Sequence, residues 1–589
     1  MTTDKIDLWE DLKGGQAGYP APNKIGPLQA ATCRDMWFEK NALSKRRQVI
    51  TSTSMATAAY PALKWRGMRL WNYIVGLVEY LMCASTPQYD DGVTAGSEFT
   101  RYIFNYFNGS GWTLQKVATA GTITTTSGSA TFTGVGTAFL TTAKVGAAIC
   151  LDTDAANGVV QAVTFRTITA VNSDTDITVS SNYTANTSGR AYTITASFPV
   201  TDSQIAYASM NNKVYVMGQT STGFSWDGTN QAWVTALPNA WFSLVFKNYM
   251  FAARTVANPS RVSWSAIKDP TTWSALNFID VSPDDGQEIV GMFSSGYGIV
   301  ILKTRSAYIL SGDVFDPSNP TYTLTQIVTP SDFQISSAAS VQPWKGGFMM
   351  LGRLGMYFLT GGVIGKLVQF DSAQDTFRNI SFVPPTLSVS GSYTSSEPRS
   401  KLVEGRYWCA VLSSDFASSV HGAVSEKNMI LVIDENDAIW RFVLNGTSAA
   451  IRGINDIAYY AANLFGVQGD DTRNQDSFMQ LDTTSGSETI SATWTSKVFE
   501  YVNQQRFGQV FVYFKKQSAG NLTFEYSVDE GSFASVTIDM TTGTGTRLKS
   551  AAIVVGRVGR SIQFRMSNTT AAQLLEIYAI ELNRKELRR

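Results

Sequence analysis

One feature of this sequence limits the fold more than any other: a short apolar strand returns along the middle of the chain, with no long helical pattern between its copies. The copies are residues 213–217, 249–252, 298–302, 347–351, 406–410 and 463–467. Each copy is expected to open a blade, and their spacing of about 35 to 60 residues is close to that of propeller blades. Strands that lack helical crossovers cannot build a parallel α/β sheet. The pattern therefore predicts an all-β fold that contains a β-propeller of about six blades.

The stretch 261–312 shows the repeating unit most fully. Val262 and Trp264 alternate with polar residues as in a strand, and Asp269 with Pro270 is a typical turn pair. Trp273 follows at a position where its ring would pack that turn against the sheet. Two short apolar runs flank a polar reversal at 303–306, which predicts a hairpin. We expect Trp264, Asp269, Pro270 and Trp273 to be structural turn and blade-core residues, and none of them to be catalytic.

Changes of composition divide the chain into four predicted parts. Residues 1–59 are rich in glycine and proline and are predicted to form an extended N-terminal arm with one short helical candidate near 34–43. Residues 60–116 together with 200–489 would form the propeller platform. Residues 117–199 hold only seven charged residues and are predicted to be an inserted β-sandwich or barrel module. Residues 490–589 contain about seven alternating strands, which is typical of a β-sandwich.

Charge and cysteine usage narrow the function classes. The 47 basic and 47 acidic residues cancel, so bulk charge gives no argument for wrapping nucleic acid or binding an anionic membrane. Only 16% of the residues are charged, which suggests that copies of the chain cover part of one another's surface. The cysteines Cys33, Cys83, Cys150 and Cys409 lie far apart, so we expect buried free thiols. The first residues lack a signal-peptide pattern, and we expect a soluble protein made in the cytoplasm.

Two basic clusters are candidate contacts to a partner. Each of them either touches phosphate or a partner protein, or is a solvated group of charges on the surface. The members are Lys45, Arg46 and Arg47 near the end of the arm, and Arg584, Lys585, Arg588 and Arg589 at the end of the chain.

The search for catalytic and binding motifs gives no candidate active site. His421 is the only histidine, and it lies in a polar stretch that is typical of a loop, which leaves a Ser or Cys nucleophile without a base. Residues 361–367 (GGVIGKL) have the wrong spacing for a phosphate loop and are predicted to be a strand turn. The acidic pairs 284–285 and 470–471 lack the alternating ligands of a calcium loop and are expected to be solvated. We therefore predict no catalytic residue, no cofactor, no metal and no small-molecule substrate.

Several of these segments carry a family resemblance. They are residues 33–39 (CRDMWFE), 43–46 (LSKR), 262–265 (VSWS), 269–273 (DPTTW), 301–303 (ILK) and 309–312 (ILSG). With them the chain resembles the tail nozzle proteins of short-tailed bacteriophages, also called tail tubular protein B or packaged-DNA stabilisation protein. The resemblance spans nearly the whole chain, and its motifs are structural turns.

The resemblance implies a structural role instead of an enzymatic one. Relatives of this kind form a homohexameric ring at the end of the tail, assembled in the host cytoplasm and carried in the virion. Such a ring would meet the tail adaptor protein on one face and carry fibres or spikes on its flanks. Double-stranded DNA would pass through its lumen without sequence-specific binding, be retained after packaging and leave during infection. The alternative is a carbohydrate-binding or glycoside-hydrolysing propeller protein, because such hydrolases need only two carboxylates about 5 to 9 Å apart.

Overall fold

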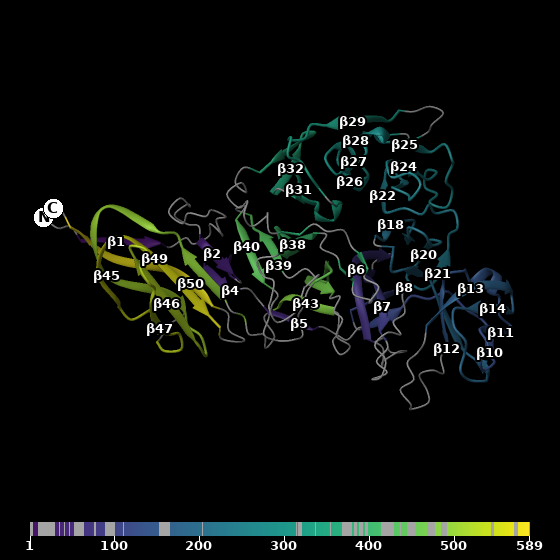
Figure 1. Cartoon of the computed structure of the whole chain (residues 1–589), viewed down its shortest axis with the longest axis horizontal. Coiled ribbons are helices and arrows are strands. Elements are labelled where there is room, and N and C mark those ends of the chain that lie inside the picture. Colours follow the sequence, from purple (N-terminus) through teal and green to yellow (C-terminus); the bar gives the residue numbers. More distant parts are fainter. Residues whose placement is uncertain are drawn as a thin grey trace.

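The computed structural model describes most of the chain. The described residues are 4–9, 30–34, 36–39, 42–45, 48–51, 64–75, 78–88, 101–109, 111–151, 165–202, 204–313, 315, 321–335, 337–353, 355–367, 380–381, 386–387, 393–394, 398–413, 429–435, 438–443, 454–467, 478–483, 490, 492–543, 547–569 and 575–587. Their regular secondary structure is almost entirely β-strand (Figure 1). No helix among them is long and apolar enough to cross a bilayer.

Seven small antiparallel sheets form the blades of a β-propeller, so the predicted all-β propeller fold is confirmed with seven blades where about six were expected. Blade 1 contains β6 (Lys64–Val75), β7 (Val78–Gln88), β8 (Arg101–Phe107), β9 (Trp112–Leu114) and β17 (Ser197–Pro199). Blade 2 contains β18 (Ala206–Met210), β19 (Lys213–Met217), β20 (Phe224–Trp226) and β21 (Gln231–Trp233). Blade 3 contains β22 (Phe242–Phe246), β23 (Tyr249–Ala253), β24 (Arg261–Trp264) and β25 (Phe278–Asp280).

The remaining blades continue in chain order. Blade 4 contains β26 (Ile289–Ser295), β27 (Gly298–Lys303), β28 (Ala307–Ser311) and β29 (Thr323–Ile327), preceded by the 3-10 turn η3 (Pro283–Asp285). Blade 5 contains β30 (Gln342–Trp344), β31 (Gly347–Gly352), β32 (Gly355–Thr360) and β33 (Val363–Lys366), preceded by η4 (Ala338–Ser340). Blade 6 contains β34 (Ile380–Ser381), β37 (Arg399–Val403), β38 (Arg406–Ser413), β39 (Met429–Ile433) and β40 (Ile439–Val443), and β35 (Thr386–Leu387) pairs with β36 (Tyr393–Thr394) beside it in sequence. Blade 7 contains β41 (Asp456–Tyr460), β42 (Asn463–Val467), β43 (Phe478–Thr483) and β5 (Gln48–Thr51).

A hydrophobic core fills every interface between neighbouring blades. Blades 1 and 2 share Trp71, Phe104 and Trp226, and the cores between the following pairs continue around the ring to blades 6 and 7. The ring then closes, because the core that contains Leu81 of blade 1 also contains Phe465 of blade 7. Burial of apolar surface at about 25 cal/mol per Å² makes these seven interfaces the main stabilising contribution to the ring.

The apolar strands that recur in the sequence are the second strands of the blades. Each of them is almost completely buried, as in β23 and β27, because a neighbouring blade covers each of its two faces. The prediction that these strands open their blades was therefore wrong by one strand. The first strands line the centre of the ring and carry a mixed pattern, as in β18, where buried and exposed residues alternate.

Five of the turns between first and second strands share one backbone conformation. They are two-residue turns in which both residues have positive φ, as at Asn211 (φ 53°) with Asn212 (φ 57°) and at Ala461 (φ 45°) with Ala462 (φ 61°). This is the type I′ geometry, which matches the twist of the flanking strands and favours Asn and Gly. The pairs are Asn211 with Asn212, Lys247 with Asn248, Lys345 with Gly346, Glu404 with Gly405, and Ala461 with Ala462. The alanine pair departs from the preferred residue types.

The N-terminal segment joins two parts of the molecule. Strand β5 is the outer strand of blade 7, so the chain that enters blade 1 first completes the last blade. The earlier strands β1 (Asp4–Trp9), β2 (Ala30–Arg34), β3 (Met36–Glu39) and β4 (Ala42–Lys45) pair with the C-terminal strands. The short helix predicted near 34–43 was wrong, because β2 and β4 obtain their backbone hydrogen bonds from strands more than 400 residues later in the chain.

The C-terminal strands form one large curled sheet at one end of the molecule (Figure 1). They are β44 (Ala492–Ser496), β45 (Phe499–Lys515), β46 (Asn521–Val528), β47 (Ala534–Asp539), β48 (Arg547–Lys549), β49 (Ile553–Asn568) and β50 (Glu576–Glu586). Strand β49 pairs with β45 along its first half and with β44 and β46 along its second half. This change of partner lets a single sheet wrap around one core, which also holds Met36 and Leu43 from the N-terminal strands.

The segment between β9 and β17 folds as a separate β-module beside blade 2 (Figure 1). Its elements are β10 (Thr122–Thr125), β11 (Thr131–Val135), α1 (Phe139–Thr142), β12 (Ala148–Leu151), β13 (Arg166–Ser173), β14 (Asp176–Val179), β15 (Thr187–Arg190) and β16 (Tyr192–Thr195). The module has its own core around Phe132, Phe139 and Ile168. Trp233 of blade 2 donates a hydrogen bond from its indole Nε1 to the carbonyl of Thr142 at 2.9 Å. The insertion is therefore anchored to the propeller and is not a free linker.

Candidate functional site

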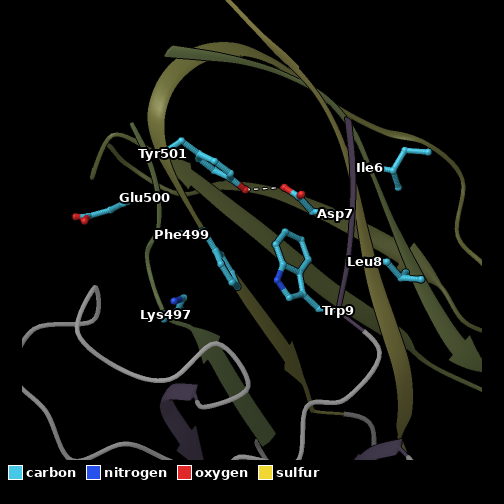
Figure 2. A pocket seen from close by; sticks show the side chains of 8 residues that line it. All are labelled: Ile6, Asp7, Leu8, Trp9, Lys497, Phe499, Glu500 and Tyr501. Atoms are coloured by element: carbon cyan, nitrogen blue, oxygen red, sulfur yellow. Dashed lines mark hydrogen bonds between the residues drawn. The ribbon is translucent and has the colours of Figure 1, made fainter. Parts of the chain in front are cut away.

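A groove lies between β1 and the segment that leads from β44 into β45 (Figure 2). Its volume is 410 Å³, and β1 lines one wall while residues 497–501 line the other. The alternation of β1 turns Asp7 and Trp9 toward Tyr501 and Phe499, whereas Ile6 and Leu8 point away from them (Figure 2). The rings of Trp9 and Phe499 pack with centroids 4.4 Å apart. The floor of the groove is thus aromatic, and its rim carries Lys497 and Glu500.

A carboxylate clamp holds this groove together. Asp7 accepts hydrogen bonds from the Tyr501 hydroxyl at 2.8 Å and from the Arg584 guanidinium at 2.5 and 3.1 Å. The same guanidinium donates to Gln505 Oε1 at 2.8 Å and lies over the Tyr501 ring at 4.3 Å. Burial, reinforced by the neighbouring Asp7 carboxylate, raises the pKa of Tyr501 well above its usual range. Because both Asp7 oxygens are engaged, the clamp fastens β1 to the C-terminal sheet and does not present a free acid.

The structure places the predicted basic contacts differently from one another. Arg584 belongs to the clamp, and Lys585 is half-buried on β50. Lys45 is only 1% exposed, and its ammonium donates to Asn568 Oδ1 at 3.0 Å. Lys45 was predicted to contact a partner at the surface, but its side chain is buried, because β4 pairs with β50 inside the C-terminal unit. The other predicted contacts, Arg46, Arg47, Arg588 and Arg589, lie outside the described residues.

The predicted blade residues lie in and after β24. Trp264 is completely buried, and its indole Nε1 donates to the carbonyl of Phe315 at 2.6 Å. Pro270 is buried in the turn, and half-buried Trp273 donates from Nε1 to the Pro270 carbonyl at 2.8 Å. Asp269 accepts from the hydroxyl and the backbone N–H of Thr271, and these hydrogen bonds hold the pKa of its carboxyl below the usual range. All four side chains therefore make contacts in blade 3 or in the turn between its strands β24 and β25.

Sequence reasoning missed a buried cation between blades 3 and 4. Lys303 was expected in a polar hairpin reversal, but its side chain is fully buried. Its ammonium lies 2.7 Å from Asp285 Oδ1, 2.8 Å from the carbonyls of Val281 and Ser282, and 3.3 Å from the hydroxyl of Ser260. Asp285, expected to be solvated, is thus the counter-ion of this lysine. The one signal in the sequence was the position of Lys303 directly after the buried run of β27.

Polar side chains from four blades meet at the centre of the propeller. Gln204, which precedes β18 of blade 2, accepts from Arg399 of blade 6 at 3.2 Å and from Arg69 of blade 1 at 3.5 Å. Arg399 also lies 3.9 Å from Asp456 of blade 7, which accepts from the backbone N–H of Leu70 at 3.1 Å. Blades 2 and 6 are not neighbours in the ring, so this bond spans the propeller axis. No sequence pattern pointed to this axial cluster, because its members are far apart in the chain.

The described residues offer structural contacts more than reactive groups. The axial cluster brings one carboxylate, Asp456, against a guanidinium and backbone N–H groups. Across the described ranges no group of three or more His, Cys, Asp or Glu side chains could hold a metal ion. Cys83, Cys150 and Cys409 are buried, as predicted, and the side chain of Cys33 lies outside the described part of the structure. The glycine pair Gly361 and Gly362 forms the turn between β32 and β33, as the sequence indicated. His421 and Asp470 with Asp471 lie outside the described residues.

Comparison with known proteins gives little beyond this geometry. No family model and no curated protein matches the chain. Among solved structures, an exo-beta-1,3-galactanase from Phanerochaete chrysosporium has 10% sequence identity and a TM-score of 0.22, covering 91% of this chain and 100% of its own. YCF48 bound to D1 peptide has 10% identity and a TM-score of 0.29, covering 62% of this chain and 94% of its own. The WD40 beta propeller domain of Doa1 has 8% identity and a TM-score of 0.24, covering 48% of this chain and 93% of its own. Similarity this low carries no argument about activity or partners.

Proposed function

We propose that the chain is a structural subunit of a phage tail nozzle, a homohexameric ring that continues the portal and adaptor channel. The ring retains packaged DNA, releases it during infection and carries fibres or spikes. The observation that supports this most is that buried or half-buried charged side chains hold separate parts of the chain together. Lys303 of blade 4 contacts Asp285 in the turn after blade 3, Arg399 of blade 6 contacts Asp456 of blade 7, and Arg584 contacts Asp7. These groups stiffen a platform, and buried hydrogen-bonded charges of this kind are costly to break.

The residues at the propeller axis indicate where DNA could pass. The Gln204 and Arg399 side chains meet across the centre of the blades, so a duplex would not pass along the axis of one subunit. Under the proposed function the DNA lumen is formed between subunits of the ring. DNA slides through such a lumen most easily when the surface does not bind phosphate strongly, which agrees with the balanced overall charge.

The test of this function is location together with stoichiometry. Purified chain, alone and with its adaptor, is measured by light scattering, and virions labelled with antibody are imaged by negative stain. A sixfold ring and label at the tail tip are expected. A persistent monomer that hydrolyses a glycan would overturn the proposal in favour of the carbohydrate-active alternative, and label confined to the capsid or to the host cytosol would overturn the tail location.

A further inference from the structure

Among the described residues, five strands of the C-terminal sheet are hydrogen-bonded to a single neighbouring strand, and the two longest of them are β1 and β47, with six residues each; the others are β2, β3 and β48. One path through this sheet follows β1, β50, β45, β49, β46 and β47, each hydrogen-bonded to the next. Within the described part of the chain β1 pairs only with β50, and β47 pairs only with β46. The two strands lie on different sides of the C-terminal unit (Figure 1). Each leaves a row of backbone N–H and C=O groups without a strand partner.

Both edges are regular, which is unusual for edges that stay free. Each strand has six residues, contains no proline and keeps one register with its neighbour. Two charged side chains of β1 are already paired, because Lys5 contacts Glu586 at 2.7 Å and Asp7 belongs to the clamp with Arg584. Native edges are normally blunted by free charges, proline or bulges. Exposed apolar side chains lie on these two edges, with Ile6 at 69%, Leu8 at 49% and Val536 at 36% exposure. The one charged residue of β47 is Asp539 at its end, which accepts hydrogen bonds from Thr541.

The direction of the strands makes the two edges complementary. Every pairing along the path is antiparallel, and the path has six strands, so β1 and β47 run in opposite directions. If two copies stand in the same orientation, β47 of one copy therefore meets β1 of the next in antiparallel alignment. The sheet would continue across the contact without a change of pattern. The equal lengths of the two strands allow all six residues to pair.

We propose that β1 of one copy pairs with β47 of a neighbouring copy, so that the C-terminal sheets join head to tail. This inference rests on the proposed ring, and it names the surface through which the subunits contact one another. A head-to-tail contact uses two different patches and closes into a ring when the rotation between copies fits. Backbone hydrogen bonds supply the contact, and Ile6 and Leu8 lose their exposure beside the partner strand.

Lysine substitutions test the two edges separately. Ile6→Lys and Val536→Lys each place a charge on one exposed edge position, where lysine is a common means of preventing strand addition. Val502→Lys is the matched control, because Val502 is 93% exposed in the same unit but lies on neither edge strand. Mass photometry should show rings for the wild type and for the control, and loss of the ring species for both edge variants. Circular dichroism should show the same β-sheet content in all four proteins.

The outcomes separate this inference from the proposed function. A wild-type chain that never forms a ring would overturn both. A ring that survives Ile6→Lys and Val536→Lys would overturn only the edge pairing. Cysteine variants then check the direction: in the full six-residue pairing Ile6 lies opposite the exposed Thr537, so Ile6→Cys mixed with Thr537→Cys should give a disulfide-linked dimer, and neither variant should do so alone. A dimer from Ile6→Cys alone would show that like edges pair, and would refute the head-to-tail arrangement.

Discussion

Replacing Trp264 by alanine should damage blade 3 more than any other single change in that blade. The indole is fully buried and packs against Phe251, Phe315 and Tyr322 with ring centroids 5.3 to 6.0 Å away. Loss of such a ring costs about 3 to 5 kcal/mol. The Phe315 carbonyl also loses its 2.6 Å hydrogen bond, which adds about 1 kcal/mol or more if no water replaces the donor. We therefore expect a total destabilisation of about 4 to 6 kcal/mol.

The matched comparison is Trp273→Ala. Trp273 is half-buried, its indole donates to the Pro270 carbonyl within its own turn, and its ring packs against the edge of the core between blades 2 and 3, so the expected loss of stability is about 1 to 2 kcal/mol. Because a chain of several parts unfolds in more than one step, hydrogen exchange of peptides that cover β23 to β25 is the suitable assay. Trp264→Ala should raise the exchange of the whole blade, and Trp273→Ala only that of the turn. Equal effects of the two substitutions would refute the packing argument.

Three further predictions concern charge and backbone conformation. Lys303→Met leaves Asp285 without its buried counter-ion, so the free energy of unfolding should fall by about 3 to 5 kcal/mol. Adding Asp285→Asn removes the unpaired charge and should restore part of the lost melting temperature. Ala462 has a φ of 61°, which glycine adopts without strain, so Ala462→Gly should stabilise the fold by about 0.5 to 1 kcal/mol and raise the melting temperature. A melting temperature below that of the wild type would show that Ala462 is not strained. Hydrogen bonding to Arg261 lowers the pKa of the Asp280 carboxyl, so this pair stabilises the fold above about pH 4, the unfolded pKa, and the stabilisation is lost as pH falls through the lower folded pKa. Arg261→Gln should therefore lower the melting temperature at pH 6 and make little difference near pH 2, and an equal deficit at both pH values would exclude this linkage.

The sequence predicted the strands that are buried on both sides and little of what surrounds them. The second strand of a blade has a neighbouring blade on each face, so it must be apolar throughout and is visible as a run such as 299–302. The first strand faces the axis, where Tyr207 and Ser209 are tolerated beside buried alanines. Its mixture of polar and apolar residues does not mark it as a strand in the sequence. This is why the blades were recognised but their opening strands and their number were not.

Pairing between distant segments was hidden for a different reason. Strand β4 is only four residues long, and its hydrogen-bonding partner β50 begins more than 500 residues later. Local propensity near 34–43 cannot report such a partner, and tertiary pairing overrode the helical tendency. The burial of Lys45 follows from the same pairing. The axial cluster of Gln204, Arg399 and Asp456 was equally out of reach, since its residues meet only when the ring has closed.

The route of the N-terminal segment links the C-terminal unit to ring closure. Two residues separate β4, which lies in the C-terminal sheet, from β5, which completes blade 7. Blade 7 therefore cannot be completed without placing β4 beside β50, and the hydrophobic core between blades 6 and 7 continues into the core that contains Leu43. A load applied to the C-terminal sheet, such as a neighbouring subunit at β1 or β47, would reach the propeller through this short connection. In a ring built on those edges, each propeller would be held by its neighbours at the same place where its own blades close.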